Sequence, residues 1–257
     1  MALIKIQDIK IKVGILYQDK NYIAVNKPSG LFVHPYKKNS GGELHLLKIV
    51  RKQTGRYLYP IHRLDRPVSG VLLFGLNKNS VRDLQQHWNT DLVVKEYLAL
   101  TRGKLEGDGV IDLPLLKKDM EGRTGPNRNF QESRTEYNLL AHLEDYSLIR
   151  VRIKSGRKHQ IRRHFATIGH HLLGDTTYGK GPINQEYRER FGHRRIFLHA
   201  HKLVLPIGQD GSPTTISCPL PQALITAFYQ LGLTSLQINE KINAEFIPPT
   251  NSIQSDE

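Results

Sequence analysis

The chain has 257 residues, of which 39% are hydrophobic, enough to bury a core as one large domain or two small ones. Lys and Arg number 37 against 24 Asp and Glu, so the formal net charge is +13, which is expected of a protein that binds a polyanion; the alternative is a basic soluble protein without such a partner. The single cysteine, Cys218, excludes a disulfide framework and an all-cysteine zinc site within the chain, and fits a reducing cytoplasm.

The first half of the chain has alternating signals for strands and helices. Residues 1–14 mix apolar and charged side chains unlike a signal peptide, and we expect them to be an N-terminal extension. Residues 15–26 predict two antiparallel strands joined by a turn. The apolar run at 71–76 predicts a buried strand, 77–89 a surface helix and 94–101 a further strand.

The second half begins with a polar segment, residues 116–133, whose Gly, Asn, Arg and Lys content predicts a long basic loop. A strand is expected over 146–153 and a helix over about 157–168. Residues 236–257 are expected to form a partly disordered tail. The sequence has no apolar run of about 18 residues or more, so we expect no membrane span. Because no internal repeat or sharp change of composition divides it, 15–235 is predicted to be one domain.

The nine residues HRLDRPVSG, from His62 to Gly70, stand just before the predicted buried strand. Asp65 lies between Arg63 and Arg66, whose charges favour the carboxylate and would keep it available as a nucleophile or a base. The alternative is an aspartate that only stabilises a turn, which is the commoner role of an isolated Asp.

The nine residues GRKHQIRRH, from Gly156 to His164, fall on the predicted helix. At about 100° per residue, Arg162 flanks the apolar face, whereas Arg163 points to the opposite side. Arg162 is therefore predicted to reach a half-buried partner. The alternative is an amphipathic helix whose basic face is only solvated.

Two other groups of residues suggest chemistry. Tyr97, in KEYLAL, is an aromatic side chain that can stack on a base, although a lone tyrosine in a strand more often only packs. His199 and His201 lie on one face of a strand, which would suit a metallohydrolase. Two histidines are too few for a catalytic zinc site, and no HExxH motif is present.

Taken together, these motifs resemble those of the RluA family of pseudouridine synthases, which isomerise uridine in RNA. VNKPSGLFVHP, SRTEY, LGDTTYG and LHA extend the resemblance, in family order, from about Ile15 to Pro219. The resemblance implies an α+β fold with a bent, mainly antiparallel sheet, flanking helices and a central basic cleft. It also implies a cytoplasmic monomer that needs no cofactor or metal. The likeness is greatest to the branch that modifies position 65 of tRNA, and rRNA is the alternative substrate.

The resemblance also assigns roles to individual residues. Asp65 would be the catalytic nucleophile or abstract a ribose proton, Arg162 would pair with it and orient it, and Tyr97 would stack on the target uracil and assist removal of its C5 proton. The expected substrate-binding residues lie in or beside these motifs: His62, Arg63, Arg66, Lys95, Arg157, His159, Gln160, Ile161 and Leu198.

Two departures from the family pattern do not affect the three catalytic candidates. Val68 replaces a usual threonine and His171 a common proline, which removes a local hydroxyl group and a rigid turn.

With about 14 residues before the first strand, RNA recognition is expected to fall to the catalytic domain alone. The rival interpretation is a catalytically silent basic RNA-binding protein, which the high net charge alone would also fit.

Overall fold

The computed structural model describes residues 12–35, 44–117, 129–179, 181–208, 212–250 and 252–253. The strands are β1 (Ile15–Gln18), β2 (Tyr22–Lys27), β3 (Tyr59–Pro60), β4 (Ser69–Gly75), β5 (Val94–Arg102), β6 (Gly109–Asp112), β7 (Leu115–Leu116), β8 (Phe130–Gln131), β9 (Arg134–Leu143), β10 (Tyr146–Ile153), β11 (Leu198–Leu205), β12 (Thr214–Ser217) and β13 (Ser252–Ile253). The helices are α1 (Leu46–Thr54), α2 (Lys78–His87), α3 (Gln160–Thr167), α4 (Gly181–Phe191), α5 (Gln222–Gln230) and α6 (Ser235–Asn243).

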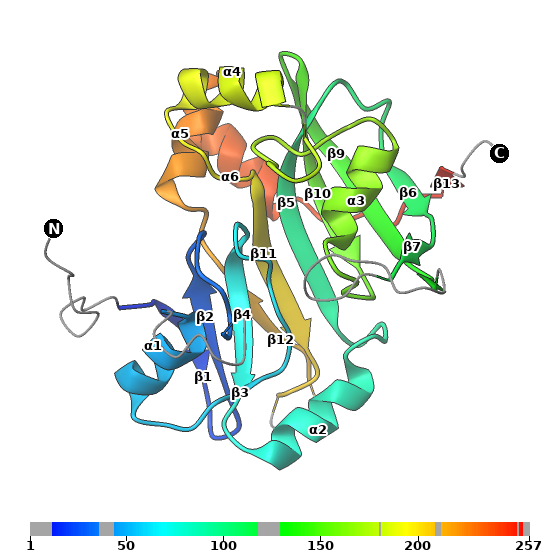
Figure 1. Ribbon diagram of the computed structural model, residues 1–257. Helices are drawn as coiled ribbons and strands as arrows, with labels where there is room; N and C mark the ends of the chain where they lie inside the picture. The colour runs from blue at the N-terminus through cyan, green and yellow to red at the C-terminus, as the bar shows by residue number, and fades with distance from the viewer. Residues whose placement is uncertain are drawn as a thin grey trace, which may run out of the picture.

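One large sheet organises the molecule and confirms the predicted α+β class. Its strands follow the order β1-β2-β4-β11-β5-β10-β9-β6-β13, with β3 beside β4 and β12 beside β11. Among the described strands, the pairs β4/β11 and β6/β13 are parallel and the others are antiparallel. Figure 1 shows β1, β2 and β4 on one side of the sheet and β10, β9 and β6 on the other, with β11 and β5 between them.

Most of the predicted elements in the first three fifths of the chain are present. The strands expected over 71–76, 94–101 and 146–153 are β4, β5 and β10. The helix expected over 77–89 is α2, which begins after Asn77 because the Asn77 side chain accepts a hydrogen bond of 2.9 Å from the Ser80 amide.

Other elements differ from expectation. The helix expected from residue 157 begins only at Gln160, because His159 has a φ of 54°, a left-handed conformation that an α-helix cannot contain. The segment expected as a tail contains α6, which starts at a capping box formed by Thr234 and Gln237. Of the expected basic loop over 116–133, residues 118–128 lie outside the described residues.

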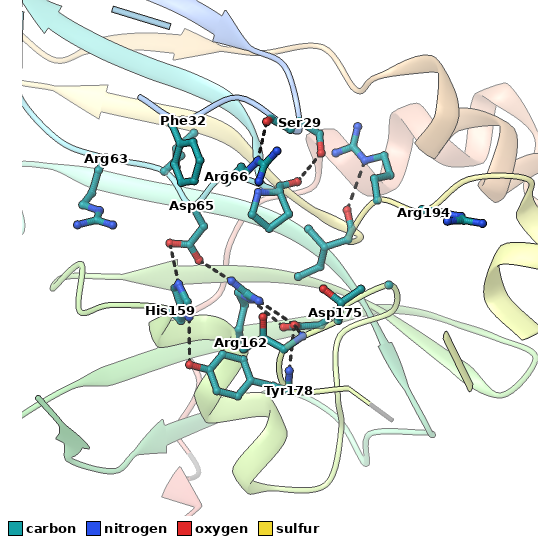
Figure 2. A pocket seen from close by; sticks show the side chains of 18 of the residues that line it. Ser29, Phe32, Arg63, Asp65, Arg66, His159, Arg162, Asp175, Tyr178 and Arg194 are labelled. Carbon is teal, nitrogen blue, oxygen red and sulfur yellow. Dashed lines mark hydrogen bonds and ion pairs between the residues drawn. The ribbon is translucent and has the colours of Figure 1, made fainter. Parts of the chain in front are cut away.

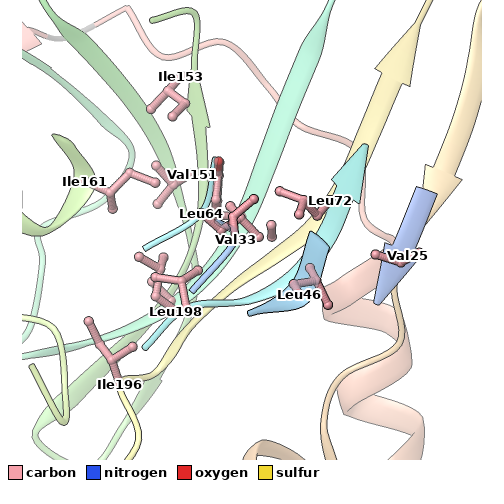
Figure 3. Close-up of a cluster of buried hydrophobic side chains, with 14 of the residues drawn as sticks. Val25, Val33, Leu46, Leu64, Leu72, Val151, Ile153, Ile161, Ile196 and Leu198 are labelled. Carbon is pink, nitrogen blue, oxygen red and sulfur yellow. The ribbon is translucent and has the colours of Figure 1, made fainter. Parts of the chain in front are cut away.

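The largest hydrophobic cluster connects the two halves of the sheet, because it contains residues of β2 and β4 and also of β5 and β10. Figure 3 shows Leu46 of α1, Leu72 of β4, Val151 of β10, Ile161 of α3 and Leu198 of β11 within it, and all five are buried. Burial of each such side chain contributes about 1.5–3 kcal/mol. The cluster therefore holds α3 against the sheet, beside the loop that leads into β4.

Two further clusters lie near the ends of the sheet. One packs α4, α5 and α6 together around Phe197 and Phe228, and the other packs α2 and β12 around Leu73 and Leu84. Within the described part of the chain, no helix has both the length and the apolar character needed to cross a bilayer.

The parallel junction between β4 and β11 requires a glycine. Gly70, which pairs with Ala200, has a φ of +123°, and a Cβ at this position would lie 2.1 Å from the Ala200 carbonyl oxygen. Beside it, Ser69 Oγ and His199 Nδ1 form a hydrogen bond of 2.8 Å. This close contact fixes the end of the loop that carries Asp65.

Candidate active site

Asp65 lies in the loop between β3 and β4, and the end of β2 braces that loop. Lys27 Nζ donates hydrogen bonds to the carbonyl oxygens of Arg66 (3.2 Å) and Val68 (2.7 Å). The Gly30 amide donates to the Arg66 carbonyl oxygen at 2.8 Å. Burial lowers the pKa of Lys27 to about 7, with the charge of Asp65 acting in the opposite direction. Two motifs from separate parts of the chain thus form one rigid support.

Arg162, on α3, binds two carboxylates at once. Its Nη1 lies 3.1 Å from Asp65 Oδ2, while its Nε and Nη2 donate to the two oxygens of Asp175 at 2.8 Å each. The exposed fractions are 3% for Arg162, 1% for Asp175 and 16% for Asp65. Figure 2 shows the guanidinium between the two aspartates. The bidentate pair fixes the plane of the guanidinium, so one N–H remains directed at Asp65, the more exposed of the two carboxylates.

Asp175 is the functional residue that the sequence reasoning did not single out, although it lies in the LGDTTYG motif. Its Oδ1 also accepts hydrogen bonds from the backbone amides of Thr177 (2.9 Å) and Tyr178 (3.1 Å). Burial opposes its charge, but these bonds and Arg162 more than offset that effect and lower the pKa of Asp175. A buried, ionised Asp175 therefore anchors Arg162.

His159 approaches Asp65 from the other side. Its Nε2 lies 3.7 Å from Asp65 Oδ1, and its Nδ1 lies 3.0 Å from the hydroxyl of Tyr178. The left-handed backbone at His159 directs the ring toward Asp65 (Figure 2). Burial lowers the pKa of His159, and the charge of Asp65 partly opposes that shift. This shift favours the neutral imidazole, which lies beside the carboxylate.

A small cavity of about 150 Å³ lies directly beside Asp65. Tyr97 lines it and is held in β5 between Val151 of β10 and Ala200 of β11. Burial, and then the charge of Asp65, raises the pKa of Tyr97, so the phenol remains protonated. Other predicted site residues line the same cavity: Arg63, Arg157, His159, Gln160, Ile161, Arg162 and Leu198.

A larger cleft of about 1040 Å³ shares Asp65 and Arg162 with the small cavity. The Arg and Lys residues of its lining are Arg63, Arg66, Lys158, Arg162, Arg194 and Arg195. Its acidic residues, Asp65 and Asp175, both bind Arg162. The lining therefore carries an excess of positive charge, which suits a polyanionic ligand.

His62 and Lys95 are not brought to either cavity. His62 Nε2 accepts a hydrogen bond of 3.1 Å from the Leu73 amide, and its ring packs on Trp88 with centroids 4.8 Å apart. Lys95 Nζ donates to the backbone carbonyl oxygens of Trp88, at 2.6 Å, and of Lys154. Both side chains join α2 to the sheet, although both belong to motifs that we expected to contact substrate.

The histidine pair considered for metal binding serves the backbone. His199 Nε2 and His201 Nδ1 lie 3.3 Å and 3.1 Å from the carbonyl oxygen of Cys218. Across the residues that the structure describes, no three or more His, Cys, Asp or Glu side chains are grouped so that they could hold a metal ion. This arrangement gives no support to the metallohydrolase alternative.

Comparisons with known proteins agree with the geometry. The family model for RNA pseudouridylate synthase matches residues 21–167. The chain is 37% identical over 236 residues to tRNA pseudouridine synthase C of Haemophilus ducreyi, covering 86% of this chain and 97% of the relative. It is 41% identical over 212 residues to the protein of that name from Pasteurella multocida, covering 76% and 87%.

Solved structures point the same way. Human RNA pseudouridylate synthase domain containing 4 superposes with a TM-score of 0.68 at 26% identity, covering 85% of this chain and 92% of that one. Human RNA pseudouridylate synthase domain containing 1 gives the same TM-score at 25% identity, covering 93% and 98%. With the motifs, the fold and a family match over more than half of its length, the chain belongs to the RNA pseudouridylate synthase family.

Proposed function

We propose that this protein isomerises uridine to pseudouridine in tRNA, with Asp65 as the residue that acts on the nucleoside. The observation that carries the proposal is the position of the Asp65 carboxylate, held by Arg162 where a base-sized cavity meets a basic cleft. The names of the bacterial relatives favour tRNA over rRNA. The motif resemblance favours position 65 of tRNA. The proposed setting is the cytoplasm, with the protein acting as a monomer.

The target uridine must leave its stack before it can react. Everting a nucleotide costs a few kcal/mol, and stacking on an aromatic side chain returns about 1–3 kcal/mol. In the proposal, Tyr97 provides that stacking surface inside the small cavity, while the basic lining of the cleft holds the RNA backbone. In the proposal, Tyr97 also assists removal of the C5 proton once the uracil has turned.

The reaction requires the N-glycosidic bond to break, the uracil to turn, and a bond to form between its C5 and the ribose carbon. The C5 proton then leaves and N1 gains a proton, so the product is an isomer of the substrate. Asp65 would either attack the nucleoside covalently or remove a ribose proton, and both roles need an ionised, correctly directed carboxylate. Arg162 supplies that direction through Nη1, and His159 limits movement of the other oxygen. Arg162 is itself fixed by Asp175.

The test uses purified protein and tRNA transcripts. Pseudouridine is detected by carbodiimide labelling and primer extension, for the wild type and for Asp65→Asn. We expect modification of one uridine by the wild type, none by Asp65→Asn, and similar tRNA affinity for both. Undiminished turnover by Asp65→Asn would refute the assigned chemistry, RNA binding without product would favour a silent binding protein, and product in rRNA transcripts alone would correct the substrate.

A further inference from the structure

The large cleft extends past the place where the uracil would sit. Tyr97 lines only the small cavity, whereas residues 193–196, in the turn between α4 and β11, line only the large one. In Figure 2, Arg63 lies at one end of the large cleft, Asp65 near its middle and Arg194 at the other end. The end formed by this turn has no function in the chemistry proposed for Asp65.

The turn between α4 and β11 is held firmly. Gly192 ends α4 in a left-handed conformation, with φ of +69°, and its amide donates to the Arg188 carbonyl oxygen at 3.0 Å. Farther along, a Cβ at Gly174 would lie 2.2 Å from the Arg195 carbonyl oxygen, so the two backbones are in close contact. The backbone of the turn therefore presents Arg194 and Arg195 from a fixed position.

Arg195 is a half-buried cation whose contacts are with neutral groups. Its Nη2 donates to Ser69 Oγ at 2.6 Å, and its Nε donates to the Ile196 carbonyl oxygen at 3.3 Å. No carboxylate of the described residues lies within 4.0 Å of its guanidinium. Burial lowers the pKa of Arg195, which reflects the cost of removing this charge from water. An anion at this position would offset that cost.

Arg194 adds a second cation at the same end. Its side chain is exposed, lines the cleft, and forms neither a hydrogen bond nor an ion pair with any residue that the structure describes. Arg190, at the end of α4, differs because both of its Nη atoms bind the carboxylate of Glu144. Two consecutive arginines, one half-buried and one exposed, thus line this end of the cleft, and neither has a carboxylate partner among the described residues.

We infer that Arg194 and Arg195 form a phosphate-binding site for a backbone phosphodiester of the RNA next to the target uridine. The inference rests on the proposed function for the identity of the ligand. Planar guanidinium groups match the geometry of phosphate oxygens, and a contact remote from Tyr97 would hold the strand while the base enters the small cavity. The site would contribute to affinity for RNA and to placement of the strand, and not to recognition of the base.

The experiment compares Arg194→Ala with Arg82→Ala. Arg82 lies on α2, remote from α4 in Figure 1, and its side chain is 74% exposed, so its removal takes away the same charge without touching the cleft. The dissociation constant for a tRNA transcript is measured between 50 and 200 mM salt. One lost phosphate contact should lower the slope of log affinity against log salt by about 0.7–0.9, and affinity at 0.1 M salt about fivefold to eightfold.

We expect Arg194→Ala to show this loss, with a larger change in KM than in kcat, and Arg82→Ala to keep the wild-type slope. Arg195→Gln, which retains a donor for Ser69 Oγ, should lower the slope similarly while its melting temperature confirms folding. Equal slopes for Arg194→Ala and Arg82→Ala would overturn the inference even if pseudouridine is formed. Different slopes in a protein that makes no pseudouridine would support the phosphate site and refute the proposed function.

Discussion

Among the residues that the structure describes, two buried arginines, Arg150 and Arg162, pair with carboxylates, and of these two only Arg162 lines the large cleft. In the interior of the sheet, Arg150 lies 3.4 Å from Glu96, and both side chains are fully buried. At the candidate active site, Arg162 holds Asp175 in the interior and Asp65 at the cleft surface. Both clusters combine charge with burial, but only the second leaves a carboxylate oxygen accessible to a ligand.

The surroundings of Arg150 explain its purpose. Its guanidinium donates to the carbonyl oxygens of Lys241 (2.6 Å), Ile242 (2.9 Å) and Ala244, at the end of α6. These carbonyl groups have no partner within the helix, and a cation complements the negative end of the helix dipole. The interior cluster therefore attaches the C-terminal helix to β10. A buried ion pair alone therefore does not mark an active site; what distinguishes the Arg162 cluster is that Asp65 lies at the cleft.

The largest expected effect is a loss of stability, and it distinguishes the Arg150 cluster from the Arg162 cluster. Arg150→Met should lower the free energy of unfolding by about 3 kcal/mol, because it leaves the carbonyl groups at the end of α6 without their donor, while Glu96 keeps Arg152 and Lys202. Urea denaturation measures this loss. Turnover per folded molecule should stay at the wild-type level, and a loss of turnover in the folded fraction would show that the interior cluster also acts on the reaction.

The second prediction concerns Arg162, where the measured loss is in the rate of the reaction. Arg162→Lys keeps the charge but cannot bind Asp175 through two N–H groups and still reach Asp65. Displacing a reacting group by about 1 Å costs about 100-fold in rate, so single-turnover pseudouridine formation should fall by about that factor. The tRNA dissociation constant serves as the control. A wild-type rate would mean that Asp65 is oriented without Arg162.

A smaller effect is expected at Asp175, which contacts the guanidinium but does not line the small cavity. Asp175→Asn loses one charged acceptor and so loosens Arg162. We expect single-turnover rates about tenfold below wild type with unchanged KM, because the guanidinium still binds Asp65 but with less precise direction. Asp175→Glu should recover part of the rate. If neither variant differs from wild type, Asp175 is structural, as Arg150 is.

The last prediction contrasts these charged clusters with a neutral buried group. His164 is fully buried, bonded to Thr135 Oγ1 at 2.8 Å, and burial lowers its pKa to about 4, opposed by the bond to the Leu113 carbonyl oxygen. The unfolded chain takes up this proton near pH 6.5 and the folded chain only near pH 4. The stability contributed by neutral His164 is thus complete above pH 6.5 and is lost as pH falls toward 4.

The test is the pH dependence of unfolding between pH 6.5 and 4. His164→Gln removes this titratable group. As the pH falls, the free energy of unfolding of the variant should therefore decrease less steeply than that of the wild type, the two slopes differing by at most about 1.4 kcal/mol per pH unit. Identical slopes for the two proteins would show that His164 has the same pKa in the folded and unfolded chains.

Local patterns were sufficient where one segment determines its own structure. The strands β5 and β10 follow from β-branched and alternating residues, and the Asn77 cap marks the start of α2. The capping box at Thr234 was also readable from sequence, but its helix was not predicted because the packing of α6 depends on Arg150, far away in the chain.

The candidate site was predictable only in part, for the same reason. The resemblance placed Asp65, Arg162 and Tyr97 in one site, and the structure brings them together. It could not identify Asp175, whose importance comes from a contact with α3. Membership of a motif also does not show where a side chain points. His62 lies three residues before Asp65, yet its ring packs on Trp88 because the loop turns between the two residues.

The sequence distance between the bonded groups has a consequence for synthesis of the protein. Asp65 is 97 residues from the arginine that directs it, and Ser69 is 130 residues from His199. A chain emerging from the ribosome exposes Asp65 long before the segments that orient it have been translated. A nascent chain that ends before β11 would therefore be inert toward RNA, and competence would arise in one late step, after about four fifths of the polypeptide has been made.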